Sequence, residues 1–228
     1  MTQTPRARAR AQTMADILRI GREHLASEGA AALSLRAVAR DLGVVSSAIY
    51  RYVASRDELL TLLVVEGYGQ LGDAVDEALA GVQGPRERLL ALGRAVRGWA
   101  VAEPATYALL FGSPVPGYTA PAEQTNEPGT RVVRALMAIL GDAYAGGLAR
   151  RRAPVASPVL RQTFAAVREE YALDLPDDVL AAGACAWASL FGCVTFEVFG
   201  QYGPGGFGDP AALFEHHLGV IADTVLSA

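Results

Sequence analysis

The chain has 228 residues, of which 51% are hydrophobic, enough to bury a sizeable core in one or two domains. Its two cysteines, Cys185 and Cys193, fall in one predicted helix, roughly 12 Å apart at the helical rise, which excludes a disulfide between them. We find no membrane-spanning run and no secretory signal, so we expect a cytoplasmic protein that binds no membrane.

The net charge of −4 is unevenly distributed along the chain. Up to Arg56 there are nine arginines and four carboxylates, a net charge of +5, so the remainder carries −9. A basic N-terminal part on an acidic remainder is typical of a protein that binds nucleic acid at one end. Residues 1–9 are polar and arginine-rich, which fits a disordered tail and an arm along DNA equally well.

Three helices are predicted in the N-terminal part of the chain. The first covers residues 10–28, and a short second one covers residues 35–42, where apolar side chains recur at helical spacing. Ser34 is the candidate cap of this second helix, and Gly43 ends it. A third begins at Ser46, and two short helices joined by a glycine turn form a helix-turn-helix pattern. The third helix carries hydroxyls, tyrosines and one arginine but no acid, so its surface can approach a polyanion.

The stretch from Ser34 to Leu60 closely resembles the DNA-binding segment of TetR-type transcriptional regulators. The matching residues are Leu42, Gly43, Val44, Ile49, Tyr50, Tyr52, Val53, Ser55, Arg56, Leu59 and Leu60. The chain departs from the family at Val45, where Ser is usual, and at Ser47, where Gly is frequent. The usual cap of the recognition helix is therefore missing, and we expect Ser46 or Ser47 to replace it.

The resemblance implies that double-stranded operator DNA is a partner of this chain. Tyr50 and Arg56 match family positions that often touch the DNA backbone, whereas the flanking exposed positions are candidates for reading bases. The expected DNA-contacting residues are Ser34, Arg36, Ser46, Ser47, Ala48, Tyr50, Arg51, Tyr52 and Arg56.

A long helix is predicted from Ser55 to Leu79, with Ser55 and Glu58 placed for a capping box. Inside it, residues 67–72 form a literal G-x-G-x-x-G. A dinucleotide fingerprint requires a strand before the glycines and a second strand about twenty residues after them, and no second strand is predicted. The glycines more simply permit close helix contacts or local bending. Two other functions remain open beside DNA binding. One is an enzyme or carrier that binds a nucleotide at Gly67–Gly72, and the other is a helical adaptor that binds only protein.

The rest of the chain is also predicted to be helical. Further helices are expected over residues 86–102, 105–111, 130–144, 160–171, 176–201 and 209–226, with loops over 112–129 and 146–158. We find no convincing strand pattern, no catalytic motif and no metal-ligand spacing. We therefore expect an all-α protein without catalytic residues, metal or cofactor.

By resemblance, residues 1–56 are a helix-turn-helix DNA-binding domain, and residues 57–228 are a ligand-binding and dimerisation domain. The runs RGWAVAEPATYALLFG and Trp187–Gly192 resemble a subgroup named for a Trp-His-Gly motif, with Phe191 in place of the His. The resemblance implies a ligand-responsive regulator, most often a repressor, that a small apolar effector releases from a palindromic operator.

Two further sets of residues are expected in the C-terminal domain. Aromatic side chains are candidates for lining an apolar ligand pocket: Trp99, Tyr107, Phe111, Phe164, Trp187 and Phe191. The resemblance implies a homodimer paired through the last two helices. The candidate dimer residues are Val194, Val198, Leu213, His217 and Val220.

Overall fold

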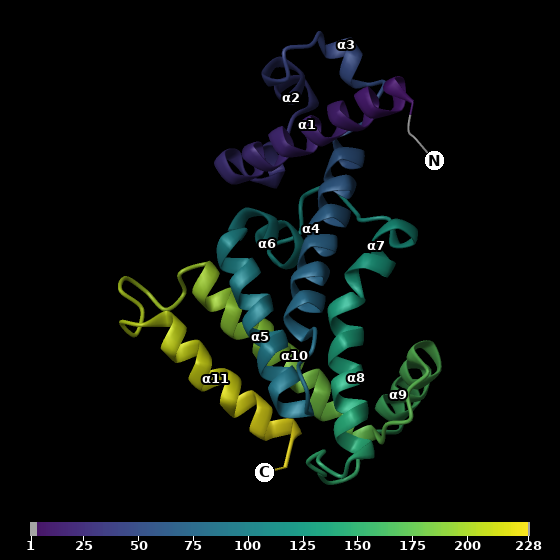
Figure 1. The fold of residues 1–228 in the computed structure, drawn as a ribbon, viewed down its shortest axis with the longest axis vertical. Coiled ribbons are helices and arrows are strands. Elements are labelled where there is room, and N and C mark those ends of the chain that lie inside the picture. Colours follow the sequence, from purple (N-terminus) through teal and green to yellow (C-terminus); the bar gives the residue numbers. More distant parts are fainter. Residues whose placement is uncertain (1–3, 228) are drawn as a thin grey trace. The chain divides into compact units, whose positions relative to one another are not determined.

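The structure is a computed structural model that describes residues 4–227. Within them the chain forms eleven α-helices, one 3₁₀ turn and no strand (Figure 1), which confirms the all-α prediction. The elements are α1 (Pro5–Glu28), η1 (Ala30–Ala32), α2 (Leu35–Asp41), α3 (Ser46–Ile49), α4 (Arg56–Leu79), α5 (Pro85–Ala102), α6 (Pro104–Phe111), α7 (Ala122–Gly129), α8 (Arg131–Ala145), α9 (Pro158–Tyr171), α10 (Asp177–Val198) and α11 (Pro210–Val225).

The chain folds into two compact units. The head unit comprises, as far as described, residues 4–70 and 103–129, and the body unit comprises residues 71–102 and 130–227. Helix α4 begins in the first and ends in the second. The compact units therefore do not follow the predicted functional boundary after residue 56, since α6 and α7 belong with the N-terminal helices. The functional division itself stays a prediction.

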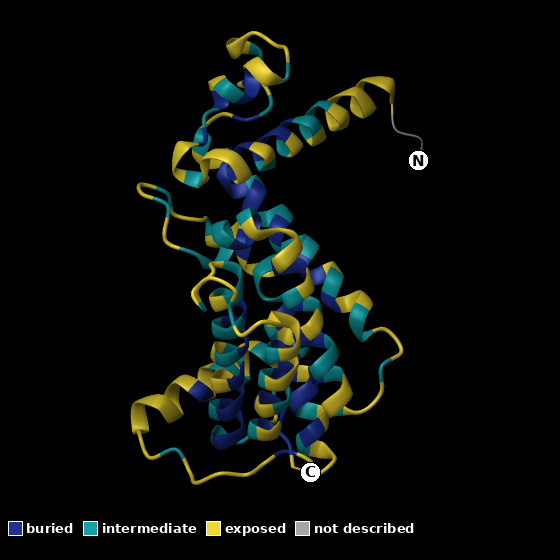
Figure 2. Ribbon diagram, turned by 90° about the vertical axis from the view of Figure 1, so that its left-hand side faces the viewer, coloured by how far each residue is buried: buried dark blue, intermediate teal, exposed yellow. Residues whose placement is uncertain are grey.

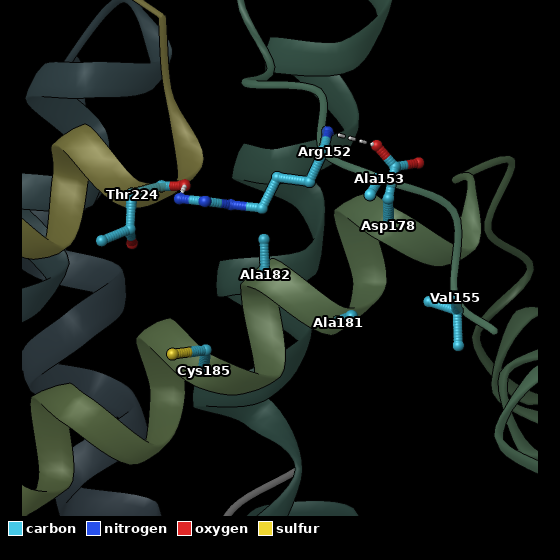
Figure 3. A pocket seen from close by; sticks show the side chains of 8 residues that line it. All are labelled: Arg152, Ala153, Val155, Asp178, Ala181, Ala182, Cys185 and Thr224. Atoms are coloured by element: carbon cyan, nitrogen blue, oxygen red, sulfur yellow. Dashed lines mark hydrogen bonds between the residues drawn. The ribbon is translucent and has the colours of Figure 1, made fainter. Parts of the chain in front are cut away.

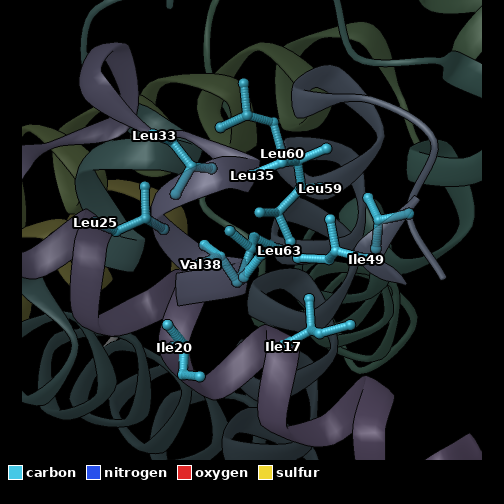
Figure 4. Close-up of a cluster of buried hydrophobic side chains, with 12 residues drawn as sticks. Ile17, Ile20, Leu25, Leu33, Leu35, Val38, Ile49, Leu59, Leu60 and Leu63 are labelled. Carbon is cyan, nitrogen blue, oxygen red and sulfur yellow. The ribbon is translucent and has the colours of Figure 1, made fainter. Parts of the chain in front are cut away.

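The core of the head unit is a cluster of apolar side chains from four helices (Figure 4). Ile17 of α1, Val38 of α2, Ile49 of α3 and Leu59 of α4 are each at most 1% exposed. The helix-turn-helix therefore rests on α1 and on the start of α4. Burial of these side chains fixes the orientation of the short α3, whose four residues cannot form a stable helix alone.

Helix α1 begins at Pro5, earlier than the predicted residue 10. The Thr4 side chain accepts a hydrogen bond from the Ala7 N–H at 3.3 Å, and Pro5 occupies the first turn, where its missing N–H costs nothing. Of the two alternatives for residues 1–9, the disordered tail is therefore excluded from Pro5 onward, and the arm along DNA stays a prediction. Residues 1–3 lie outside the described part of the chain.

The predicted caps of the two short helices are not formed. Ser34 stands at the N-cap of α2, but its side chain makes no capping hydrogen bond. The N-cap of α3 is Val45, again without a side-chain bond, so neither Ser46 nor Ser47 replaces the missing serine. Both serines lie inside α3 and are exposed, so their hydroxyls remain on the surface of the recognition helix.

The predicted capping box of α4 is present in a shifted form. The Ser55 hydroxyl accepts from the Glu58 N–H at 3.0 Å. The Glu58 carboxylate in turn accepts from the N–H of Ala54, one residue before the cap. Two backbone donors at the start of the helix are thus satisfied.

The glycine cluster lies inside the uninterrupted helix α4, so the strand-turn-helix that a nucleotide would require is absent there. A Cβ added at Gly67 would come within 2.7 Å of the Thr106 side chain on α6, and one at Gly72 within 2.6 Å of the Arg131 guanidinium. These glycines therefore allow close packing against α4, as expected, and they do not form a nucleotide site.

The predicted loop over residues 112–129 is partly helical, because residues 122–129 form α7. The Thr125 hydroxyl donates to the Pro121 carbonyl at 2.9 Å at the start of this turn. Before it, the Tyr118 hydroxyl lies 3.1 Å from the Thr61 hydroxyl on α4. The contact between Tyr118 and Thr61 holds the segment to α4, which its Pro and Gly content did not indicate.

Helices α5, α8, α10 and α11 form the core of the body unit. Leu92, Ile139, Val194 and Leu218, one from each helix, are at most 1% exposed. Of the helices in the described residues, α10 alone is long and apolar enough to cross a membrane, and residues 179–196 carry no charge, so the statement that no such run exists is wrong. Its buried face packs against the other three helices, as expected for a core helix.

Arginines connect the segment between α8 and α9 to the start of α10 and to the end of α11. Arg150 and Arg152 donate to the carbonyl oxygens of Leu226 and Thr224 at the end of α11. Arg151 makes a bidentate pair with Asp178 at the start of α10, at 2.9 and 3.0 Å. These arginines are therefore not free in a solvated loop.

Candidate nucleic-acid interface

A hollow of about 490 Å³ opens in the head unit beside the recognition helix α3, and we call it the first hollow. It is lined by Leu33, Ser34, Leu35, Arg36, Tyr50, Ala54, Ser55 and Arg56. Four of the nine predicted DNA-contacting residues thus share one concave, hydroxyl-rich surface. Hydroxyls and guanidinium groups are the side chains that bind phosphate oxygens.

Arg36 and Tyr50 are exposed on this surface, as are the smaller Ala54 and Ser55. Tyr50 is 49% exposed although it is a large aromatic residue. Arg36 forms no ion pair with any carboxylate among the described residues, whereas Arg22 pairs with Glu66 at 2.6 Å. An unpaired guanidinium beside a free phenol hydroxyl is available to an external anion.

Arg56 is different, because its guanidinium is engaged inside the head unit. Its Nε donates to the Leu33 carbonyl at 3.2 Å, and its Nη2 donates to the carbonyl oxygens of Ala30 and Ala31 at 3.0 and 3.1 Å. The remaining nitrogen lies 3.5 Å from Asp57. Arg56 therefore connects η1 to the start of α4, and few of its donors are left for a phosphate.

The recognition helix presents a small polar surface. Ser46 and Ser47 are exposed, Ala48 is half-buried, and Ile49 anchors the helix in the core. Arg51, just after the helix, is exposed and has no ion pair in the described part of the chain. Ser46, Ser47 and Arg51 are therefore accessible, as the base-reading hypothesis requires, and the hypothesis itself stays a prediction.

Some other charged groups of the head unit are paired with each other. His24 is 7% exposed, and its Nε2 lies 2.7 Å from the Asp41 carboxylate, which Arg40 also contacts at 3.1 Å. The hydrogen bonds from His24 and Arg40 lower the pKa of Asp41 below its ordinary value. These pairs connect α1 to the end of α2 and hold the helix-turn-helix in place.

The six predicted ligand-binding residues divide between the two units. Tyr107 and Phe111, with ring centroids 5.1 Å apart, belong to the head unit. The other four, Trp99, Phe164, Trp187 and Phe191, belong to the body unit.

In the body unit, the rings of Trp187 and Phe191 lie 4.3 Å apart. The indole N–H of Trp99 is buried and has no hydrogen-bond partner in the described structure. Unpaired buried donors are rare in folded proteins. Two polar side chains of the same unit are not available to a ligand beside these rings, because Glu197 is paired with Arg97 at 2.6 and 2.8 Å and Gln162 is exposed.

A separate hollow of about 360 Å³ lies in the body unit beside α10 (Figure 3). It is lined by Arg152, Ala153, Val155, Asp178, Ala181, Ala182, Cys185 and Thr224. None of the predicted ligand-binding residues is among them. No motif marked this hollow in the sequence, because its wall is assembled from three segments far apart in the chain.

The predicted dimer residues differ in accessibility. Val194 is fully buried in the body core, so its assignment to a partner face is contradicted. Val198, Leu213 and His217 are half-buried, whereas Val220 is 51% exposed. Phe196 on α10 and Phe199 just after it are 46% and 40% exposed, and helical spacing alone does not distinguish such an outward stripe from an inward one.

Comparisons with known proteins agree with this geometry. A family model described as bacterial regulatory proteins of the tetR family matches residues 17–63, and one described as a tetracyclin repressor-like C-terminal domain matches residues 89–221. An HTH-type transcriptional regulator of Mycobacterium bovis is 46% identical over 209 residues, covering 91% of this chain and 89% of the relative. A counterpart of Mycobacterium tuberculosis strain H37Rv has the same identity and coverage.

Solved structures show the same fold. A crystal structure of a regulatory protein, 34% identical, superposes with a TM-score of 0.76 and covers 96% of this chain and 98% of its own. The TetR-family regulator PfmR from Thermus thermophilus is 18% identical, with a TM-score of 0.62 over 91% of this chain and 97% of its own. The second likeness concerns the fold alone.

Proposed function

We propose that this chain, which belongs to the tetR family of bacterial regulatory proteins, is a cytoplasmic repressor that a small effector releases from its operator. Membership makes it a DNA-binding transcriptional regulator with a ligand-binding C-terminal domain. Regulators of this family bind operator DNA and small-molecule effectors and form homodimers. Repression rather than activation, the small effector and the DNA-contacting residues are proposed here, and no catalytic activity is proposed.

The buried, unpaired indole N–H of Trp99 carries the effector part of the proposal. An indole nitrogen can only donate, and burial without an acceptor costs free energy. An effector with one acceptor atom and an otherwise apolar body would satisfy this donor. The hollow of Figure 3 is the weaker candidate, since its Asp178 carboxylate and Thr224 carbonyl already bind arginines.

Operator binding is assigned to the exposed residues around α3. Arg36 and Tyr50 would bind backbone phosphates, and Ser46, Ser47 and Arg51 would read bases. Two such heads in a homodimer, about 34 Å apart along the duplex, would read a two-fold operator. We also propose that the chain belongs to the Trp-His-Gly subgroup of the family.

The experiment has two stages. Selection of bound sequences from random duplex DNA by the full chain is expected to enrich a palindrome, and enrichment of no sequence would contradict the operator. Apolar compounds are then screened by intrinsic fluorescence in a Trp187→Phe variant, in which Trp99 is the only remaining tryptophan.

The coupling is tested with a compound found in this way. Its affinity is measured with and without the selected duplex, and DNA should weaken it by the same factor by which the compound weakens DNA binding. Equal affinities in the two conditions would contradict effector control. Loss of binding in a Trp99→Phe variant is the expected sign that the compound uses the unpaired donor.

A further inference from the structure

A second hollow, of about 310 Å³, opens in the head unit where the N-terminal turns of α1 meet the end of the helix-turn-helix. It is lined by Arg6, Ala9, Arg10, Thr13, Arg51 and Tyr52. Consecutive residues after α3 thus line different hollows. Tyr50 lines the first hollow, whereas Arg51 and Tyr52 line the second hollow. The end of the recognition helix lies between them.

Burial of side chains does not stabilise the N-terminal part of α1. From Pro5 to Asp16 no residue of the helix is buried, and Figure 2 shows this end of α1 exposed. At the helical rise this is about 18 Å of helix beyond the first buried residue, Ile17. The segment nevertheless begins at a defined cap on Thr4.

The charges on this segment are of one sign. Arg6, Arg8 and Arg10 precede the first carboxylate of the chain, Asp16, and Arg6 and Arg10 stand four positions apart on one helix face. Like charges at this spacing oppose helix formation. Arg51 adds a third guanidinium to the second hollow, and none of the three forms an ion pair within the described residues.

One contact shows how the segment is oriented. The Arg10 guanidinium lies 5.2 Å from the centroid of the Tyr52 ring and donates to the Arg51 carbonyl at 3.4 Å. These contacts hold the start of α1 against the residues that follow α3. The Arg6 side chain has no partner among the described residues. Three gathered guanidinium groups with no carboxylate fit an anion of the size of a phosphate.

From these observations we infer that the second hollow binds a backbone phosphate of the same duplex that α3 reads, with Arg6 and Arg10 as its ligands. The inference rests on DNA binding by the head unit and adds a contact outside the helix-turn-helix. The two hollows hold the duplex on both sides of the recognition helix, which fixes the position of α3 in the groove. The arginine-rich start of α1 is then part of the DNA-binding interface.

The test measures the salt dependence of binding to a mixed-sequence duplex and to a duplex selected by the wild-type chain. Arg6→Ala is the main variant, because Arg6 makes no contact that holds the head unit together. Arg8→Ala is its matched control, since Arg8 is exposed, carries the same charge two positions away and does not line the hollow.

Loss of one phosphate contact should reduce the slope of log affinity against log salt by about 0.9. We expect this reduction on both duplexes for Arg6→Ala and not for Arg8→Ala, with Arg6→Lys close to wild type. An equal reduction in the Arg8 variant, or none in the Arg6 variant, overturns the inference. Circular dichroism of each variant establishes that the helix is retained.

Failure of the inference is distinct from failure of the proposed function. If the wild-type chain binds no duplex in this assay, the DNA-binding function itself fails. If the wild type binds and selects a sequence while Arg6→Ala behaves as Arg8→Ala does, only the second hollow fails.

Discussion

The Arg56 guanidinium donates to the backbone carbonyl of Leu33 at 3.2 Å and thereby joins the start of α4 to the entrance of the helix-turn-helix. By sequence this arginine matched a DNA-contacting position, yet its nearest partners are carbonyl oxygens of its own unit. The bond assigns Arg56 to building the interface, and it leaves the exposed Arg36 as the nearer candidate for phosphate.

Replacing Arg56 by Ala should lower the stability of the head unit by about 2 kcal/mol, because three carbonyl oxygens lose a charged donor. The salt slope of DNA binding should stay close to that of the wild type. Arg36→Ala should do the opposite, reducing the slope by about 0.9 without a loss of stability. Urea unfolding and salt titrations of both variants check this pair, and a reduced slope in Arg56→Ala would restore its phosphate role.

Gly67→Ala should destabilise the protein even though alanine is the better helix former. The new methyl would lie 2.7 Å from the buried Thr106 side chain, and overpacking of this kind costs about 1–3 kcal/mol. Gly69→Ala is the control, since nothing lies within 4 Å of a Cβ there, and it should stabilise the helix by about 0.5–1 kcal/mol. Thermal unfolding of both variants measures the difference, and equal midpoints would contradict the close contact.

Asp178 should make the body unit sensitive to acid. Its side chain is 5% exposed, and the hydrogen bonds from Arg151 lower its pKa below the ordinary value of about 3.9. A depressed pKa contributes stability that is fully present above that ordinary value and is lost as the pH falls through the lowered pKa. Asp178→Asn should therefore be less stable than wild type near neutral pH, with the difference shrinking below about pH 4.

The control for this prediction is Asp174→Asn, which alters an exposed carboxylate close by in the sequence. Urea unfolding of the three proteins near neutral pH and in acid gives the required differences. A constant gap between wild type and Asp178→Asn at all pH values would mean that the carboxylate charge contributes nothing.

Stability of the homodimer should depend on the exposed face of α11. It should not depend on those predicted dimer residues that are buried in the core. Val220 is exposed, so Val220→Asp should raise the dimer dissociation constant about tenfold or more, because a symmetric interface buries two charges at once. Val194 is fully buried, so Val194→Ala should cost about 2 kcal/mol of stability with little effect on association. Light scattering over a range of concentrations separates the two variants, and an undisturbed Val220→Asp dimer would move the interface elsewhere.

Much of the molecule followed from the sequence by itself. Helical spacing and glycine ends gave the number and order of most helices, because an amphipathic helix must repeat its apolar residues every three to four positions to bury one face. The basic stretch ending at Arg56 and the matches from Leu42 to Leu60 identified a DNA-binding segment. Gly67 and Gly72 were correctly assigned to close helix contacts, because no second strand was predicted after them.

Only the tertiary structure decided which side chains remain available. Spacing places Val194 and Val220 equally well on a partner face, but burial in the core excludes the first and leaves the second exposed. Arg36 and Arg56 carry the same charge, yet the carbonyl oxygens of η1 engage only one of them. Such differences depend on contacts between residues far apart in the chain, and local periodicity contains no information about them.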